Sequence, residues 1–166
     1  MSNAKKIEFE IICEDILNNN KFKSLNSELH HGISRYDHSM RVAKYTYNVA
    51  RTLKWKNYKE VTRAALLHAF YNDFELVNDN SYQKLSLHPI KAMQNAKDIF
   101  NVDERYLSAI KTHMFPMTKE LPKYKESWLI TLTDKTAATY EMLHFKLSLK
   151  LSLLIIFLYN VITIEK

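Results

Sequence analysis

Four histidines and one aspartate occupy positions where side chains are expected to point into a hydrophobic core. His38, His68, His88 and His113 each lie on a separate predicted helix, or at the end of one, beside apolar residues. Burying four imidazoles without partners is costly, and a shared metal ion removes that cost by binding their ring nitrogens. Asp134 lies on the apolar face of a further predicted helix, where an unpaired carboxylate is also unfavourable. We therefore predict that these five side chains bind metal.

The elements that must position these residues are predicted to be short helices. Helices are expected over residues 7–17, 34–53, 61–71, 89–100, 103–113 and 126–143. Residues 73–87 and 114–124 are polar or contain proline, so we expect loops there. This places His68 within a helix, and Pro89 at the first position of the next helix. The sequence thus predicts an all-α fold, a single-domain helical bundle.

The composition supports a helical domain and excludes several kinds of site. The chain has 166 residues, of which 46% are hydrophobic, enough for one core. It contains one glycine, Gly32, and three prolines, which is few for a protein built from sheets and tight turns. Rossmann and Walker nucleotide sites need several glycines in one loop and are therefore excluded. Cys13 is the only cysteine, which excludes an internal disulfide and a thiolate zinc cluster.

The net charge of +6 has two interpretations. It is consistent with an ordinary soluble basic domain, and also with attraction to phosphate-bearing ligands. Lysines and arginines are spread along the chain and no RNA-binding signature occurs, so we do not expect nucleic acid as a partner. The N-terminus lacks the apolar segment of a secretory signal, and the cytoplasm is the expected location.

The C-terminal tail differs from the rest of the sequence. Residues 151–164 are nearly all apolar and lack the amphipathic period of the earlier helices. This run is shorter than the roughly 20 apolar residues that a membrane span needs. We expect a buried or homodimer-forming terminal helix, with a membrane-associated tail as the alternative. We expect the chain to divide into an N-terminal helix and loop that pack on the core (1–29), a helical domain (30–143) and this tail (144–166).

The order of the motifs resembles the HD-domain family of phosphohydrolases. Residues 31–42 resemble the family's opening motif, and Leu66-Leu67-His68 its central motif. His88-Pro89, residues 110–113 and Thr133-Asp134-Lys135 resemble its later motifs in the same order. The resemblance covers roughly residues 30–143. It implies the HD-type helical fold and metal-dependent hydrolysis of a small phosphorylated substrate, a nucleotide or a related phosphate ester.

The resemblance also implies how the ligands are shared. His38, His68 and Asp134 would bind a first ion, and His88 and His113 a second. This is the arrangement of the two-metal branch that includes bacterial diadenosine tetraphosphate hydrolases. Mixed histidine and carboxylate ligands suit Fe, Mn, Co or Zn better than Mg or Ca.

Two cationic residues and one further histidine are candidates for catalysis or substrate binding. Arg35 lies three residues before His38 and can point to the same pocket mouth, where its fork suits phosphate; a surface salt bridge is the alternative. Lys135 follows Asp134 and either offsets phosphate charge or is simply solvated. His31 is expected to line the entrance or to be an ordinary loop residue. The predicted catalytic set is thus Asp134, Arg35 and Lys135, and the predicted substrate-binding set is Arg35, His31 and Lys135.

Ala69 departs from the family pattern. The family has an aspartate after the central histidine, and in the two-metal branch it bridges both ions. Alanine cannot bind a metal, so the repulsion between two ions is less compensated. We expect reduced metal occupancy and impaired hydrolysis. The sequence leaves open whether Ala69 is engineered or natural. It also leaves open a non-catalytic module on this fold that binds a nucleotide or a partner.

Overall fold

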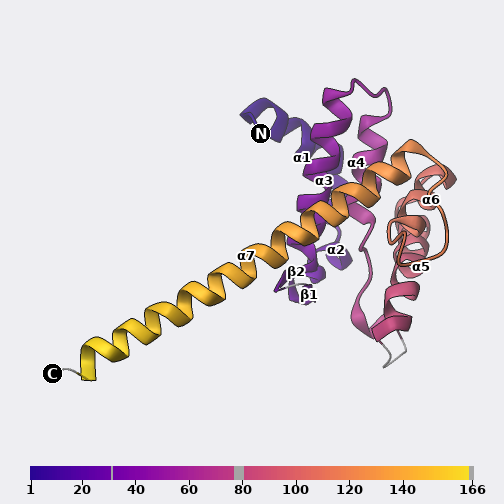
Figure 1. Cartoon of the computed structure of the whole chain (residues 1–166). Coiled ribbons are helices and arrows are strands. Elements are labelled where there is room, and N and C mark those ends of the chain that lie inside the picture. The colour runs from indigo at the N-terminus through magenta and orange to yellow at the C-terminus, as the bar shows by residue number, and fades with distance from the viewer. Residues whose placement is uncertain (31, 77–80, 165–166) are drawn as a thin grey trace.

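The chain folds into a cluster of helices from which the last helix projects (Figure 1). This computed structural model describes residues 1–30, 32–76 and 81–164. Its helices are α1 (Asn3–Asn18), α2 (Asn20–Ser24), α3 (Arg35–Thr52), α4 (Tyr58–Leu67), α5 (Ser81–Phe100), α6 (Glu104–Thr112) and α7 (Lys125–Ile164). Short 3-10 turns cover Leu25–Ser27 and Asp73–Glu75, and two-residue strands β1 (Leu29–His30) and β2 (Ile33–Ser34) pair antiparallel. The all-α prediction is confirmed.

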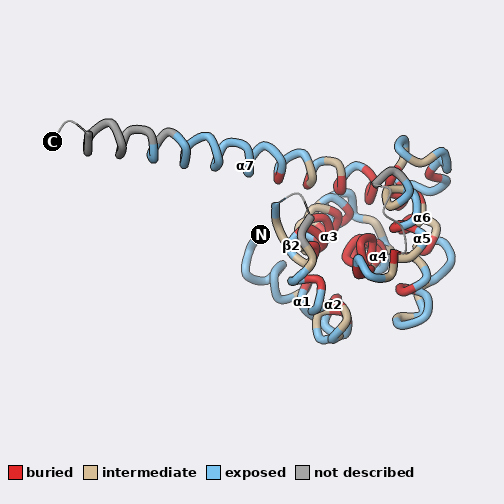
Figure 2. The backbone as a smooth tube through the Cα atoms, turned by 90° about the horizontal axis from the view of Figure 1, so that it is seen from below, coloured by how far each residue is buried: buried red, intermediate tan, exposed pale blue. Residues whose placement is uncertain are grey.

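The core is built around α3 and α4, where the buried residues concentrate (Figure 2). In α4 the second half, from Ala64 to Leu67, is buried without interruption. Two alanines in this stretch let neighbouring helices approach closely, and α4 contacts α3, α6 and α1. From α1, Phe9 packs edge-on against Tyr47 of α3, with 5.9 Å between ring centroids. The N-terminal helix is therefore packed on the core.

Side-chain caps fix where two site-bearing helices begin. Ser34 caps α3, because its hydroxyl accepts a hydrogen bond from the Asp37 backbone N–H at 3.0 Å. Asp103 caps α6 by accepting from the Arg105 backbone N–H at 2.9 Å. Both starts agree with the sequence. His68 was expected within a helix, but α4 ends at Leu67 and His68 is its C-cap residue.

The predicted start of α5 is wrong. The helix begins at Ser81, so part of the expected loop is helical and Pro89 lies inside the helix. The polar residues around Gln83 obscured a helical pattern, in which Leu85, His88 and Ala92 fall on one face at spacings of three and four. As a result, His88 lies two turns into α5 and is held by a continuous helix.

The glycine turn between β1 and β2 meets α7 at Phe145. Gly32 has a φ of +87°, a backbone conformation that residues with a side chain rarely adopt. A Cβ at this position would lie 2.8 Å from Cδ2 of Phe145, so the ring rests directly on the glycine backbone. The only glycine of the sequence therefore serves both the turn and this close approach.

From Met142 onward the described side chains of α7 are exposed, and past the contact of Phe145 with the Gly32 turn the helix projects from the domain (Figures 1 and 2). The expectation of a buried tail is wrong for these residues, whose large apolar side chains are 44–68% exposed from Met142 to Ile156. Because apolar residues occur on every side of this segment, packing one side on the core would still leave apolar side chains in solvent. In the part of the chain that is described, no helix is long and apolar enough to cross a membrane. Dimer formation stays a prediction.

Candidate metal centre

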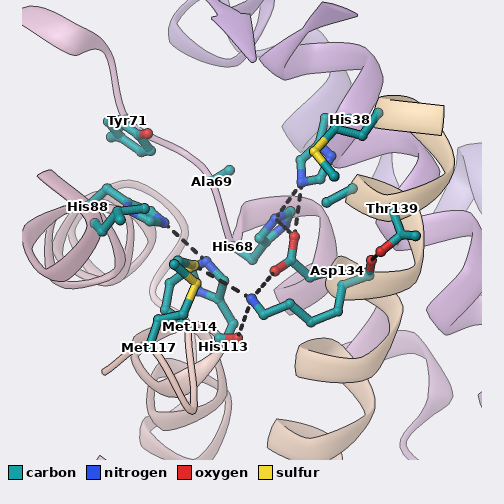
Figure 3. Close-up of a pocket in the computed structure, with 14 residues that line it drawn as sticks. His38, His68, Ala69, Tyr71, His88, His113, Met114, Met117, Asp134 and Thr139 are labelled. Carbon is teal, nitrogen blue, oxygen red and sulfur yellow. Dashed lines mark hydrogen bonds and ion pairs between the residues drawn. The ribbon is translucent and has the colours of Figure 1, made fainter. Parts of the chain in front are cut away.

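Three of the predicted ligands form one buried cluster at the junction of α3, α4 and α7 (Figure 3). Nε2 of His38 lies 3.1 Å from Oδ1 of Asp134 and 3.2 Å from Nε2 of His68. Nε2 of His68 lies 3.6 Å from the same carboxylate oxygen. These three ligand atoms all fall within 4.8 Å of one another, close enough to share a single ion.

The other two predicted ligands form a second pair beside the first. His88 of α5 and His113, the C-cap residue of α6, approach with 3.2 Å between their Nε2 atoms. The ring of His113 packs edge-on against that of His68, with 4.9 Å between centroids. The structure thus brings together all five side chains that the sequence singled out.

Backbone carbonyls fix the orientation of three of the four rings. Each of these rings donates its Nδ1–H to the carbonyl of the preceding turn: His68 to Ala65 (2.8 Å), His88 to Lys84 (3.1 Å) and His113 to Ile110 (2.6 Å). A carbonyl oxygen can only accept, so the hydrogen must be on Nδ1 and the Nε2 lone pair faces the cluster when the ring is neutral. The rings are thus held in the tautomer that a metal requires.

Burial keeps the second pair neutral. It lowers the pKa of His88 to about 4 and that of His113 well below its usual value. At neutral pH their two Nε2 lone pairs therefore face each other without a hydrogen between them. A cation at this point would turn that repulsion into two bonds.

Glu141 is a site residue that the sequence interpretation missed. Its buried carboxylate accepts a hydrogen bond from Nδ1 of His38 at 2.9 Å and also pairs with Arg41. A carboxylate behind a ligand histidine orients the ring and raises its basicity. Glu141 lies seven residues after Asp134, two turns along the same face of α7, and this spacing could have identified it.

The charges around His38 make its ring a cation when no metal is bound. Burial lowers the pKa of His38, but the hydrogen bonds to Asp134 and Glu141 outweigh it and raise that pKa to about 9. For Asp134, burial raises the pKa, but the hydrogen bond from His38 and the adjacent His68 ring hold it well below its usual range. A metal at Nε2 of His38 must therefore displace one proton.

This competition predicts a pH dependence of metal affinity. The apparent Kd for Mn²⁺ is expected to fall about tenfold per unit between pH 7 and pH 8.5, because His38 stays protonated up to about pH 9. Isothermal titration in several buffers measures both the Kd and the one proton released per ion. A Kd that is constant from pH 7 upward would contradict a proton held by His38.

A cavity of about 380 Å³ opens over the cluster. Nζ of Lys135 lines it and lies 2.8 Å from Oδ2 of Asp134 and 3.4 Å from the carbonyl of His113. The ammonium of Lys135 therefore lies beside the ligand cluster, and its role toward a phosphate stays a prediction. The described lining residues are His38, His68, Ala69, Tyr71, Leu85, His88, His113, Met114, Met117, Asp134, Lys135, Ala138, Thr139 and Met142.

Ala69 lies in the wall of this cavity, beside His68 (Figure 3). It is 6% exposed, so a larger side chain at this position would enter the cavity rather than solvent. Asp134 is the only carboxylate among the described lining residues. Asp73, the carboxylate nearest to His68 in the sequence, does not line the cavity and pairs with Arg35 at 2.8 Å.

Arg35 does not line the cavity, contrary to expectation. Its guanidinium is 3% exposed and donates hydrogen bonds to the Tyr71 carbonyl (2.9 Å) and to Asp73 (2.8 Å). It also stacks on the Tyr71 ring at 4.0 Å, and Glu28 lies 3.5 Å away. These contacts bring together segments far apart in sequence, which the spacing to His38 could not reveal. His31, the expected entrance residue, lies outside the described residues.

A substitution separates the structural role of Arg35 from a role in binding. Arg35→Met is expected to lower the free energy of unfolding by about 2–3 kcal/mol, because Glu28 and the Tyr71 carbonyl lose their partner. Urea denaturation measures this change, and Arg35→Lys is the matched control that retains the charge. Phosphate affinity that falls in Arg35→Met without any loss of stability would show that Arg35 reaches the ligand instead.

The helical domain brings together buried histidines and an aspartate from α3, α5, α7 and the C-terminal caps of α4 and α6, and three of them could hold a metal ion. Comparison with protein-family models matches the HD domain over residues 35–139, and the chain belongs to the HD-domain family. The match begins with α3 and ends within α7, so it includes all five predicted metal ligands. No curated protein and no solved structure is similar enough to match.

Proposed function

We propose that this chain is a metal-dependent phosphohydrolase of the HD family whose turnover is impaired by Ala69. The observation that carries the proposal is the convergence of four histidine Nε2 atoms and Asp134 in one buried cluster. His38, His68 and Asp134 would hold a first ion of Fe, Mn, Co or Zn. His88 and His113 would hold a second ion more weakly, because no carboxylate is shared with them.

The residues around the ligands have distinct roles in this proposal. A bound transition metal supplies Lewis-acid chemistry, polarising a phosphate oxygen and lowering the pKa of a water molecule. Lys135 is placed to offset phosphate charge at the mouth of the cluster. Glu141 keeps the His38 ring turned toward Asp134. The substrate would be a small phosphorylated molecule, a nucleotide or a related ester, in the cytoplasm.

A second candidate function is a non-catalytic module that binds a nucleotide or a partner. The observation that favours it is Ala69, which leaves Asp134 as the only carboxylate among the described cavity residues. In this case the site would bind its ligand but would not cleave it.

Elemental analysis of the purified protein tests the proposal. We expect about one transition-metal ion per chain, and slow cleavage of a nucleotide or phosphate-ester panel after loading with Mn²⁺. Metal and nucleotide binding with no cleavage would favour the non-catalytic module. Protein that contains no metal, and takes up none on dialysis against Mn²⁺, contradicts the phosphohydrolase, and nucleotide affinity without metal would favour the non-catalytic module.

A further inference from the structure

Apart from the metal ligands, Lys135 and Thr139, the described residues of the cavity wall are apolar or aromatic. Met114, Met117 and Met142 line it together with Leu85, Ala138 and the ring of Tyr71. Figure 3 shows Met114 and Met117 beside His113, with Tyr71 on the side of His88. Methionine side chains are flexible and polarisable, and they make favourable contacts with aromatic rings. The walls are therefore suited to an apolar or aromatic group.

Among the described residues that line the cavity, positive charge is limited to one ammonium. Lys135 is the only lysine or arginine among the described lining residues, and it already pairs with Asp134. Arg35 is held behind Tyr71 by its own ion pair and carbonyl contact. A chain of several phosphates is normally held by several lysines or arginines. Here a second phosphate would lie against methionines and lose hydration without gaining partners.

We propose that the site binds a phosphate monoester whose organic part is apolar or aromatic, and that it discriminates against ligands with more than one phosphate. The single phosphate lies at the metal cluster and Lys135, and the organic group packs on the methionines and Tyr71. The cavity volume, about 380 Å³, is near the lower end of the range for small-molecule sites. This inference rests on the proposed function, because the phosphate is placed by the same metal cluster.

Three ligands that bind metal ions weakly in solution separate the possibilities. Phenyl phosphate has one phosphate and an aromatic ring, glycerol 3-phosphate has one phosphate and a polar group, and fructose 1,6-bisphosphate has two phosphates. With the Mn²⁺-loaded protein, calorimetry is expected to show phenyl phosphate binding about tenfold more tightly than glycerol 3-phosphate, because its ring is buried. Fructose 1,6-bisphosphate is expected to bind no more tightly than glycerol 3-phosphate.

A second lysine at the cavity should weaken the preference for phenyl phosphate over fructose 1,6-bisphosphate. Met117 is 54% exposed, in the segment between α6 and α7, so Met117→Lys can be introduced without disturbing the core. We expect it to strengthen fructose 1,6-bisphosphate binding about tenfold and to weaken phenyl phosphate binding severalfold. Ile11→Lys is the matched control, because Ile11 is exposed on α1 and does not line this cavity. It adds the same charge and should change neither affinity.

The outcomes distinguish this inference from the proposed function. If fructose 1,6-bisphosphate binds the unmodified protein more tightly than phenyl phosphate, the inference is wrong while the phosphate site remains. Equal affinity for phenyl phosphate and glycerol 3-phosphate also overturns it. If no ligand binds and no metal loads, the proposed function itself fails, and the inference fails with it.

Discussion

Replacing Ala69 with aspartate is expected to raise Mn²⁺ affinity about 100-fold, which corresponds to about 2.8 kcal/mol. It should also raise the metal content from about one ion per chain toward two. The reason is geometric, because Ala69 lines the cavity next to His68 and the two histidine pairs adjoin there. A carboxylate at this position adds one negative charge and a ligand within reach of both pairs. We expect metal-dependent hydrolysis of a phosphate ester to become readily measurable.

The same change should have opposite effects on stability with and without metal. In EDTA, Ala69→Asp places a second buried carboxylate near Asp134, so the melting temperature should fall. With Mn²⁺ it should rise above that of the unmodified protein, because the ion binds the folded state more tightly. Ala69→Asn is the matched control, with similar size and no charge. If Ala69→Asp changes neither metal content nor hydrolysis, the position is not part of the metal centre.

Asp134→Asn is expected to lower metal affinity at least about 1,000-fold, because it removes the only carboxylate among the described cavity residues. The amide has nearly the same shape, so the fold should be retained. Without the charge of Asp134, the pKa of His38 should also fall from about 9. Calorimetry with Mn²⁺ measures the first effect, and NMR titration of the His38 ring measures the second.

An exposed acidic residue elsewhere provides the control for Asp134→Asn. Asp98 lies on α5, is exposed and is not part of the cavity, so Asp98→Asn removes the same charge without touching the cluster. It should leave both metal affinity and the His38 pKa unchanged. Asp134→Asn protein that binds Mn²⁺ like the unmodified chain would show that the ion lies elsewhere.

The ligand cluster could be predicted from sequence because local rules place each of its members. Helical spacing put the histidines beside core positions, and the cap residues Ser34 and Asp103 marked where two of the helices begin. Glu141 was missed although the same periodicity on α7 contains its signal. The start of α5 was missed because the polar residues around Gln83 obscure the first turns of its apolar stripe, which continues through Ala92 to Ala96.

The position of Arg35 could not be predicted by such rules. Its partner Asp73 is 38 residues away in sequence, and only the packing of that segment against α3 brings the two together. The exposure of the described residues after Glu141 could not be predicted by these rules either. Their apolar side chains form no single helical stripe that would indicate a buried face. Local spacing thus identified the ligands, whereas tertiary contacts determine that Lys135, and not Arg35, lines the cavity.

Anomalous X-ray diffraction from crystals grown with Mn²⁺ tests the central claim most directly. The account predicts an anomalous peak for Mn²⁺ within bonding distance of Nε2 of His38, Nε2 of His68 and a carboxylate oxygen of Asp134. A weaker peak or none is expected between His88 and His113. Crystals of Ala69→Asp should show both peaks at full strength. No anomalous peak at His38, His68 and Asp134 in either crystal would contradict the assignment of this cluster as a metal centre.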